Sequence, residues 1–101
     1  MTERLSSEVI SIHNENGSKV VTVEISRLSP SIHRFDALSA ERARVRALAA
    51  VGVFDSVSGF YKNLRDGVFD GDINRMTNIK DFTEVDTDYP PRERYIVEID
   101  R

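Results

Sequence analysis

The sequence predicts one α+β domain, in which an antiparallel sheet of three or four strands is covered on one face by two or three helices. Three observations lead to this fold class. An Asn-Gly pair joins two alternating apolar segments near the N-terminus, two central segments carry apolar residues at helical spacing, and the C-terminal segment alternates again. A chain of 101 residues has room for a single domain, so the prediction covers 1–101 as one unit.

The N-terminal segment is predicted to form a β-hairpin. Glu8 to His13 and Lys19 to Ile25 alternate between apolar and polar residues. Asn16-Gly17 between them favours a type I′ turn, because both central residues of that turn need a positive φ. The turn also fixes the strand register. The predicted facing pairs on the apolar side are Ile12–Val21 and Ile10–Val23, with Glu15–Ser18 beside the turn.

Two helices are predicted after a serine-rich crossing segment that contains Pro30. The first runs from Asp36 or Ser39 to Val51 and has an alanine-rich back, which would be the seam if the chain forms a dimer. The second runs from about Asp55 to Asp66, and both are expected to pack on the apolar face of the sheet. Apolar residues of the second helix form one stripe at helical spacing: Val57, Phe60, Tyr61, Leu64 and Val68.

The connector Gly-Val-Phe-Asp occurs twice, at residues 52–55 and 67–70. Its glycine suits the left-handed conformation that follows a helix end. The valine can fold back on the preceding helix, the phenylalanine can anchor the entry to the next helix, and the aspartate can cap that helix. We interpret the string as one helix-to-helix joint used twice, which explains architecture and not chemistry.

The C-terminal third is predicted less uniquely. Asp72 to Lys80 fits a short helix, whereas Ile79 to Val85 fits a short strand, and the sequence leaves the two alternatives open for 72–85. Asp86 to Pro91 is typical of a turn. Glu93 to Asp100 alternates with Tyr95, Val97 and Ile99 on one face, which predicts a strand that pairs with the hairpin.

The composition indicates a small soluble domain. The net charge is −3, charged residues make up 31% and hydrophobic residues 40% of the chain. The absence of cysteine excludes disulfides, thiolate metal sites and cysteine nucleophiles. No apolar run reaches the roughly 20 residues of a membrane helix, and the N-terminus has no apolar signal region. We therefore expect a cytoplasmic protein with no membrane partner.

A calcium loop is a minor alternative function. Asp70, Asp72 and Asn74 place oxygen side chains at alternate positions, and Asp81 falls at the twelfth place of an EF-hand-like loop. The sixth place, which needs a glycine, holds Arg75. The favoured interpretation of 70–81 is an acidic helix-capping turn, and no cofactor is predicted.

Binding of nucleic acid is the main alternative. Arg42 and Arg46 share one side of the first predicted helix, and Lys62 and Arg65 lie on the second. Phosphate contacts need such cations on one face. Against this stand the acidic net charge and Glu41, which is interleaved with the arginines, so a solvated helix surface is the favoured interpretation.

No catalytic motif is present, because His13 and His33 have no nucleophile at a meaningful spacing. By elimination, the sequence predicts a small non-enzymatic interaction protein that binds another macromolecule, as a regulator, inhibitor or accessory protein of the kind phages and mobile elements also encode. A protein is the expected partner, and a homodimer stays open. Besides the cations above, a second predicted surface would suit a basic partner. It consists of Glu84, Asp86, Asp88 and Tyr89.

Overall fold

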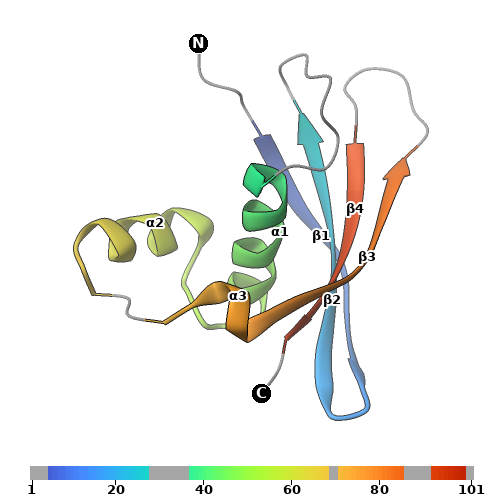
Figure 1. Cartoon of the computed structure of the whole chain (residues 1–101), viewed down its shortest axis with the longest axis horizontal. Coiled ribbons are helices and arrows are strands. Elements are labelled where there is room, and N and C mark those ends of the chain that lie inside the picture. The colour runs from blue at the N-terminus through green and yellow to red at the C-terminus, as the bar shows by residue number, and fades with distance from the viewer. Residues whose placement is uncertain (1–4, 28–36, 69–70, 86–91, 100–101) are drawn as a thin grey trace.

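The computed structural model describes residues 5–27, 37–68, 71–85 and 92–99. They form a four-stranded antiparallel sheet with strand order β1-β2-β4-β3 and helices on one face, which confirms the predicted α+β class (Figure 1). The C-terminal strand pairs with the hairpin as expected. The elements are β1 (Leu5–Glu15), β2 (Ser18–Arg27), α1 (Ala37–Ala50), α2 (Val57–Arg65), α3 (Ile73–Met76), β3 (Thr77–Val85) and β4 (Arg92–Ile99).

The hairpin turn forms as the sequence predicts. Asn16 and Gly17 have φ values of 53° and 84°, and Ile12 faces Val21. The predicted pairing of Ile10 with Val23 is wrong, because β1 carries a β-bulge and Val23 faces Val9 instead. A bulge adds one unpaired residue to a strand and shifts every pair beyond it. Two neighbouring apolar residues, Val9 and Ile10, hide this shift from an alternation pattern.

The core lies between α1 and the central strands β2 and β4. Six of the eight residues predicted for the apolar face are buried there: Val21, Val23, Ile25, Tyr95, Val97 and Ile99. The other two, Ile10 and Ile12, are 44% and 46% exposed. The alanines of α1 allow its close approach to the sheet, and Ala43 and Ala47 are fully buried inside the molecule. The prediction that the alanine-rich back of this helix serves as a dimer seam is therefore wrong.

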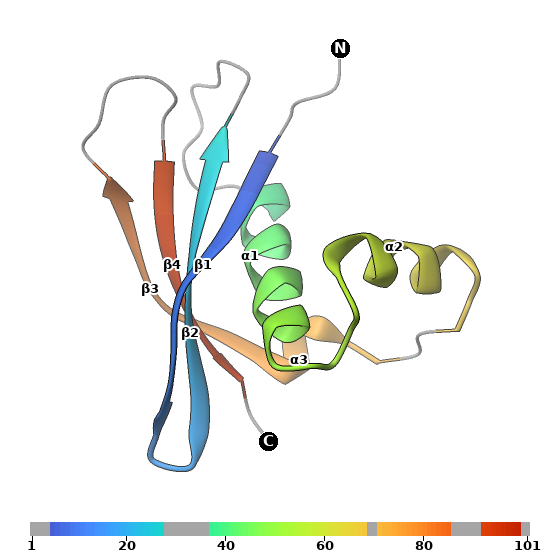
Figure 2. The same cartoon turned by 180° about the vertical axis from the view of Figure 1, so that it is seen from behind.

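Helix α2 stands away from the sheet and packs against α1 (Figures 1 and 2). The prediction that both long helices cover the sheet is thus correct for α1 alone. Of the predicted stripe, only Phe60 is buried, at 3% exposure, while Val57 and Tyr61 are partly buried. A stripe at helical spacing shows that a helix has an apolar face, but it does not say what covers that face.

The segment 72–85, left open between helix and strand, contains both. Asp72 caps the single turn of α3 by accepting a hydrogen bond of 2.9 Å from the backbone N–H of Asn74. The chain then enters β3, which forms one edge of the sheet and has its own β-bulge between Ile79 and Asp81.

Both Gly-Val-Phe-Asp joints end a helix in the predicted way. Gly52 and Gly67 have φ values of 89° and 73°. The N–H of Val53 donates to the carbonyl of Leu48 at 3.0 Å, and that of Val68 donates to the carbonyl of Asn63 at 2.9 Å. These bonds, with one from each glycine N–H, form the Schellman motif at both sites.

The predicted cap of the second helix at Asp55 is wrong by one residue. Ser56 is the N-cap, and its hydroxyl accepts a hydrogen bond of 2.9 Å from the N–H of Gly59. Serine and aspartate are equally good caps, so adjacent residues of these types leave the boundary undecided from sequence. The capping residue predicted for the second joint, Asp70, lies outside the described residues.

The face of the sheet opposite α1 is closed in part by ion pairs. Lys80 on β3 reaches Glu15 on β1 at 3.0 Å, although these strands are the two edges of the sheet. Val20, on this face, is only 1% exposed. The hydrogen bond from Lys80 lowers the pKa of Glu15, and the same bond raises the pKa of Lys80. Glu24 is nearly buried between Arg92 and Arg94, each at 3.1 Å.

Candidate interaction surface

Exposed large apolar side chains gather at two places on the described part of the chain. Leu64 and Val68, at the far end of α2, are 51% and 70% exposed, and we call them the α2 patch. Ile10, the extra residue of the β1 bulge, and Ile12 are also exposed. Contiguous apolar surface in water is a common mark of an interaction site, whereas single exposed apolar residues are ordinary. The apolar pattern of the sequence instead predicts all four side chains on faces that pack together in the core.

The first turns of α2 are tied to α1 by an aromatic cluster. The rings of Phe54 and Phe60 lie 4.9 Å apart, and those of Phe60 and Tyr61 lie 5.0 Å apart. The hydroxyl of Tyr61 donates to Glu41 of α1 at 3.0 Å, and the guanidinium of Arg42 lies 5.5 Å from the centre of its ring. Burial, reinforced by the bond to Glu41, raises the pKa of Tyr61. These contacts hold α2 at a fixed position on α1.

The last turn of α2 extends beyond this cluster. Leu64 is one turn past Phe60 and Tyr61, and Val68 follows the helix end. Lys62 and Arg65 are exposed in the last turn of α2, and the Nε of Arg65 is 3.7 Å from Asp66. An ion pair between exposed groups contributes little, so Arg65 stays available to a partner. The end of α2 thus carries both exposed apolar side chains and exposed cations.

The arginines proposed for nucleic acid lie in different surroundings. Arg42 is stacked on Tyr61 and belongs to the α1–α2 contact. Arg44 donates to the side chain of Asn74 on α3. Arg46 is half-buried, and its Nε has no hydrogen-bond partner within the described residues. The structure therefore joins Arg42 to the helix that carries Lys62 and Arg65, but it uses Arg42 in an internal contact.

The predicted acidic surface is described at one residue. Glu84 is exposed on the edge strand β3. Asp86, Asp88 and Tyr89 lie outside the described residues, so that prediction stays a prediction.

The candidate calcium ligands are spread over two elements. Asp72 caps α3, and Asn74 on α3 accepts the bond from Arg44. Asp81 lies on β3, where its carboxylate accepts a 2.8 Å bond from the next backbone N–H, that of Phe82. Asp70 is outside the described residues. Within the described ranges, no group of three or more histidine, aspartate or glutamate side chains could hold a metal ion.

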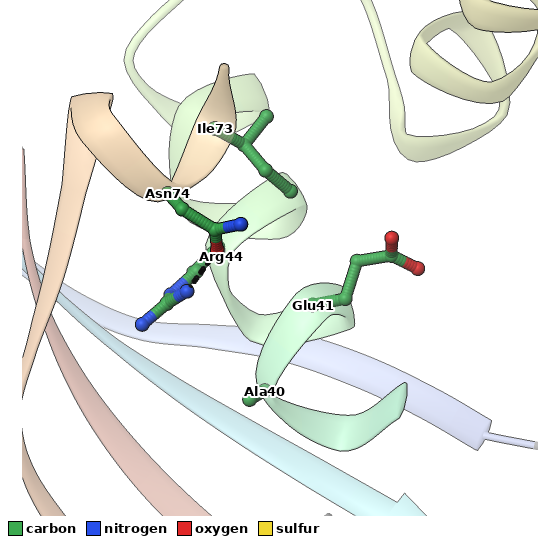
Figure 3. Close-up of a pocket in the computed structure, with 5 residues that line it drawn as sticks. All are labelled: Ala40, Glu41, Arg44, Ile73 and Asn74. Carbon is green, nitrogen blue, oxygen red and sulfur yellow. Dashed lines mark hydrogen bonds between the residues drawn. The ribbon is translucent and has the colours of Figure 1, made fainter. Parts of the chain in front are cut away.

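A shallow hollow of about 280 Å³ lies between α1 and α3 (Figure 3). Its lining residues are Ala40, Glu41, Arg44, Ile73 and Asn74. Arg44 and Asn74 bond to each other across one side, and Ile73 forms another side (Figure 3). The one cation at the hollow is thus already engaged. The sequence did not predict the hydrogen bond between Tyr61 and Glu41 or the one between Arg44 and Asn74, because each bond joins residues that are far apart in the chain.

Among the described residues, no helix is long and apolar enough to cross a membrane. Comparisons with protein-family models, with curated proteins and with solved structures find no match.

Proposed function

We propose that this protein is a non-enzymatic interaction protein that binds another protein through the end of α2. One observation carries the proposal: Leu64 on α2 and Val68 just after it are 51% and 70% exposed, whereas the other apolar residues of α2 already pack against the core. An amphipathic helix with an uncovered apolar end fits a groove or a second helix on a partner. Burying two such side chains contributes up to about 1.5–3 kcal/mol each, relative to leaving them exposed.

The charge at the end of α2 specifies the partner further. Lys62 and Arg65 are exposed in the same last turn of the helix as Leu64. Complementary charge at the rim of an interface steers association and selects among partners. We therefore propose a partner surface with an apolar centre and carboxylates around it.

Quantitative affinity capture from the native host tests this function. The wild type is compared with a Leu64→Ser/Val68→Ser double variant and with an Ile12→Ser control, which removes exposed apolar surface on β1 instead. We expect at least one protein to be retained by the wild type and the control and lost with the double variant. Calorimetry with the purified partner should then show binding at least about tenfold weaker for the double variant.

A second measurement separates this proposal from nucleic-acid binding. Retention on DNA that falls steeply with salt, and that disappears in an Arg46→Glu/Arg65→Glu variant, would identify the rival function. These two positions leave the Arg42–Tyr61 contact in place. Equal capture by wild type and Leu64→Ser/Val68→Ser would overturn the role of the α2 patch, whatever the DNA result.

A further inference from the structure

The hollow between α1 and α3 brings together two opposite charges that lack a charged partner (Figure 3). Arg44 donates to the neutral amide of Asn74, and its Nε is buried without a hydrogen-bond partner. Glu41, one helical turn earlier, accepts from the neutral hydroxyl of Tyr61. Within the described ranges, neither Glu41 nor Arg44 forms an ion pair, although both are half-buried. Charges that are withdrawn from water are usually paired, so each of these two side chains has room for a charged ligand.

The amide of Asn74 is oriented by Arg44. A guanidinium can only donate hydrogen bonds, so the amide oxygen must face Arg44 and the amide NH2 group must point another way. Figure 3 shows this nitrogen turned toward the side of the hollow on which Ile73 and Glu41 lie. The backbone N–H of Asn74 also donates to Asp72 at 2.9 Å, which anchors the residue on α3. One side of the hollow therefore offers N–H donors backed by a positive charge, and the other side offers a carboxylate.

Apolar side chains separate these two polar sides. Ile73 and Ala40 line the hollow between them, and Ile73 also packs against the core of the domain (Figure 3). The volume of about 280 Å³ lies just below the roughly 300–1,000 Å³ of pockets for drug-sized ligands. The hollow is thus suited to a smaller molecule with a negative end, a short aliphatic middle and a positive end.

We propose that this hollow binds a small zwitterion of the amino-acid class. The carboxylate of the ligand accepts from the NH2 group of Asn74 and from Arg44, its ammonium group donates to Glu41, and its methylene groups lie on Ile73 and Ala40. Hydrogen bonds between charged groups are about twice as strong as neutral ones. Both charged side chains of the hollow thereby gain the opposite charge that they lack within the described residues. This inference does not depend on the α2 patch.

An NMR titration with matched probes tests both ends of the ligand. Glycine, β-alanine and γ-aminobutyrate carry the same two charges at increasing separation. Each is compared with the simple carboxylate and the simple amine of the same chain length, which keep only one of the charges. We expect the side-chain NH2 signal of Asn74 to shift saturably with at least one zwitterion, with a Kd of about 1 mM or below. The two single-charge analogues of that zwitterion should bind at least about tenfold more weakly.

Two substitutions each remove one charge while preserving the rest of the side chain. Glu41→Gln keeps an oxygen that accepts from Tyr61, and Arg44→Met keeps an unbranched apolar stem. Each should weaken binding of the zwitterion at least about tenfold, and Glu41→Gln should not weaken binding of the carboxylate probe. Arg46→Met is the matched control, because Arg46 is also half-buried on α1 with an unpartnered Nε but does not line the hollow. Circular dichroism checks that every variant is folded.

Three results would overturn the proposal. The first is the absence of a saturable shift with all three zwitterions up to about 10 mM. The second is a carboxylate or an amine probe that binds as tightly as its zwitterion, since one charge would then suffice. The third is an Arg46→Met variant that weakens binding as much as Arg44→Met does. Leu64→Ser/Val68→Ser should bind the zwitterion as the wild type does, so a failure of the α2 proposal leaves this one standing.

Discussion

The glycine and valine of the two Gly-Val-Phe-Asp joints make the same backbone hydrogen bonds in opposite surroundings. Each ends a helix with a left-handed glycine and a valine N–H bonded to a carbonyl five residues back. At the first joint, Val53 packs against the core and Phe54 is 6% exposed. At the second, Val68 is 70% exposed. The same Gly-Val step thus lies against the core at one joint and in water at the other.

This difference in burial shows that neighbouring residues decide how a helix ends, whereas tertiary contacts decide whether that end is buried. A Schellman motif depends on glycine at the position past the helix end, and the chain supplies that glycine at both joints. Burial depends on what lies across from the joint. Val53 and Phe54 meet α1 and Phe60, whereas Val68 follows a helix whose only extensive contact among the described elements is with α1.

The largest effect is expected from removing the buried anchor of the first joint. Phe54→Ala should lower the free energy of unfolding by about 3–5 kcal/mol, because it leaves a cavity beside Phe60. Val68→Ala, at the second joint, should change it by less than about 0.5 kcal/mol. Urea unfolding followed by circular dichroism measures both. Similar losses for the two variants would show that the joints are equally buried in solution.

A smaller effect is expected from the glycines. A Cβ atom at Gly52 or Gly67 would meet no atom within 4 Å, so alanine there costs only the left-handed strain of about 1–2 kcal/mol. Gly52→Ala should reduce global stability by this amount, and Gly52→Asn should lose less because asparagine tolerates the conformation.

The same change at the second joint should act locally. Gly67→Ala is expected to speed hydrogen exchange in α2 while leaving global unfolding nearly unchanged, since α1 is the one described element with which α2 makes extensive contact. A global loss equal to that of Gly52→Ala would mean that α2 unfolds together with the rest of the domain.

Features that depend on neighbouring residues were predictable from the sequence. The Asn16-Gly17 turn, both helix ends and the alternation of β2 and β4 follow from local conformational preference and period. Features that depend on contacts between distant segments were not predictable. A strand with a bulge at Ile10 has the same apolar pattern as a regular strand, and a helix that packs on α1 has the same pattern as one that packs on the sheet.

The candidate surface illustrates the same limit. The stripe Val57-Phe60-Tyr61-Leu64-Val68 correctly indicated an amphipathic α2, and it correctly named Phe60 as buried. It did not distinguish Phe60 from Leu64, because only the placement of α1 decides which turn is covered. The sequence likewise does not show that Arg42 stacks on Tyr61, because this contact depends on how α1 and α2 pack together.

Alkaline pH should weaken the attachment of α2 to α1. Burial and the bond to Glu41 raise the pKa of Tyr61 above its ordinary value of 10.0. The protonated tyrosine is therefore favoured in the folded state, and its stabilisation is complete below pH 10.0 and lost as the pH rises through the folded pKa. We expect wild-type stability to fall more steeply than that of Tyr61→Phe as the pH rises above 10.0, measured by urea unfolding. A parallel fall in both proteins would show that Tyr61 ionises as freely in the folded state as in the unfolded one.

The smallest expected effect on stability concerns the second joint itself. Leu64→Ser/Val68→Ser removes two side chains that are 51% and 70% exposed, so the free energy of unfolding should change by less than about 0.5 kcal/mol per substitution. A pair of changes at the first joint, Val53→Ser/Phe54→Ser, should unfold the domain at a much lower urea concentration, because Phe54 is buried and packs beside Phe60. If the double change in α2 instead lowered the stability of a dimeric wild type in a concentration-dependent way, Leu64 and Val68 would be buried between two copies of the chain. If Leu64→Ser/Val68→Ser is as stable as the wild type but no longer binds the partner, Leu64 and Val68 serve binding and not folding.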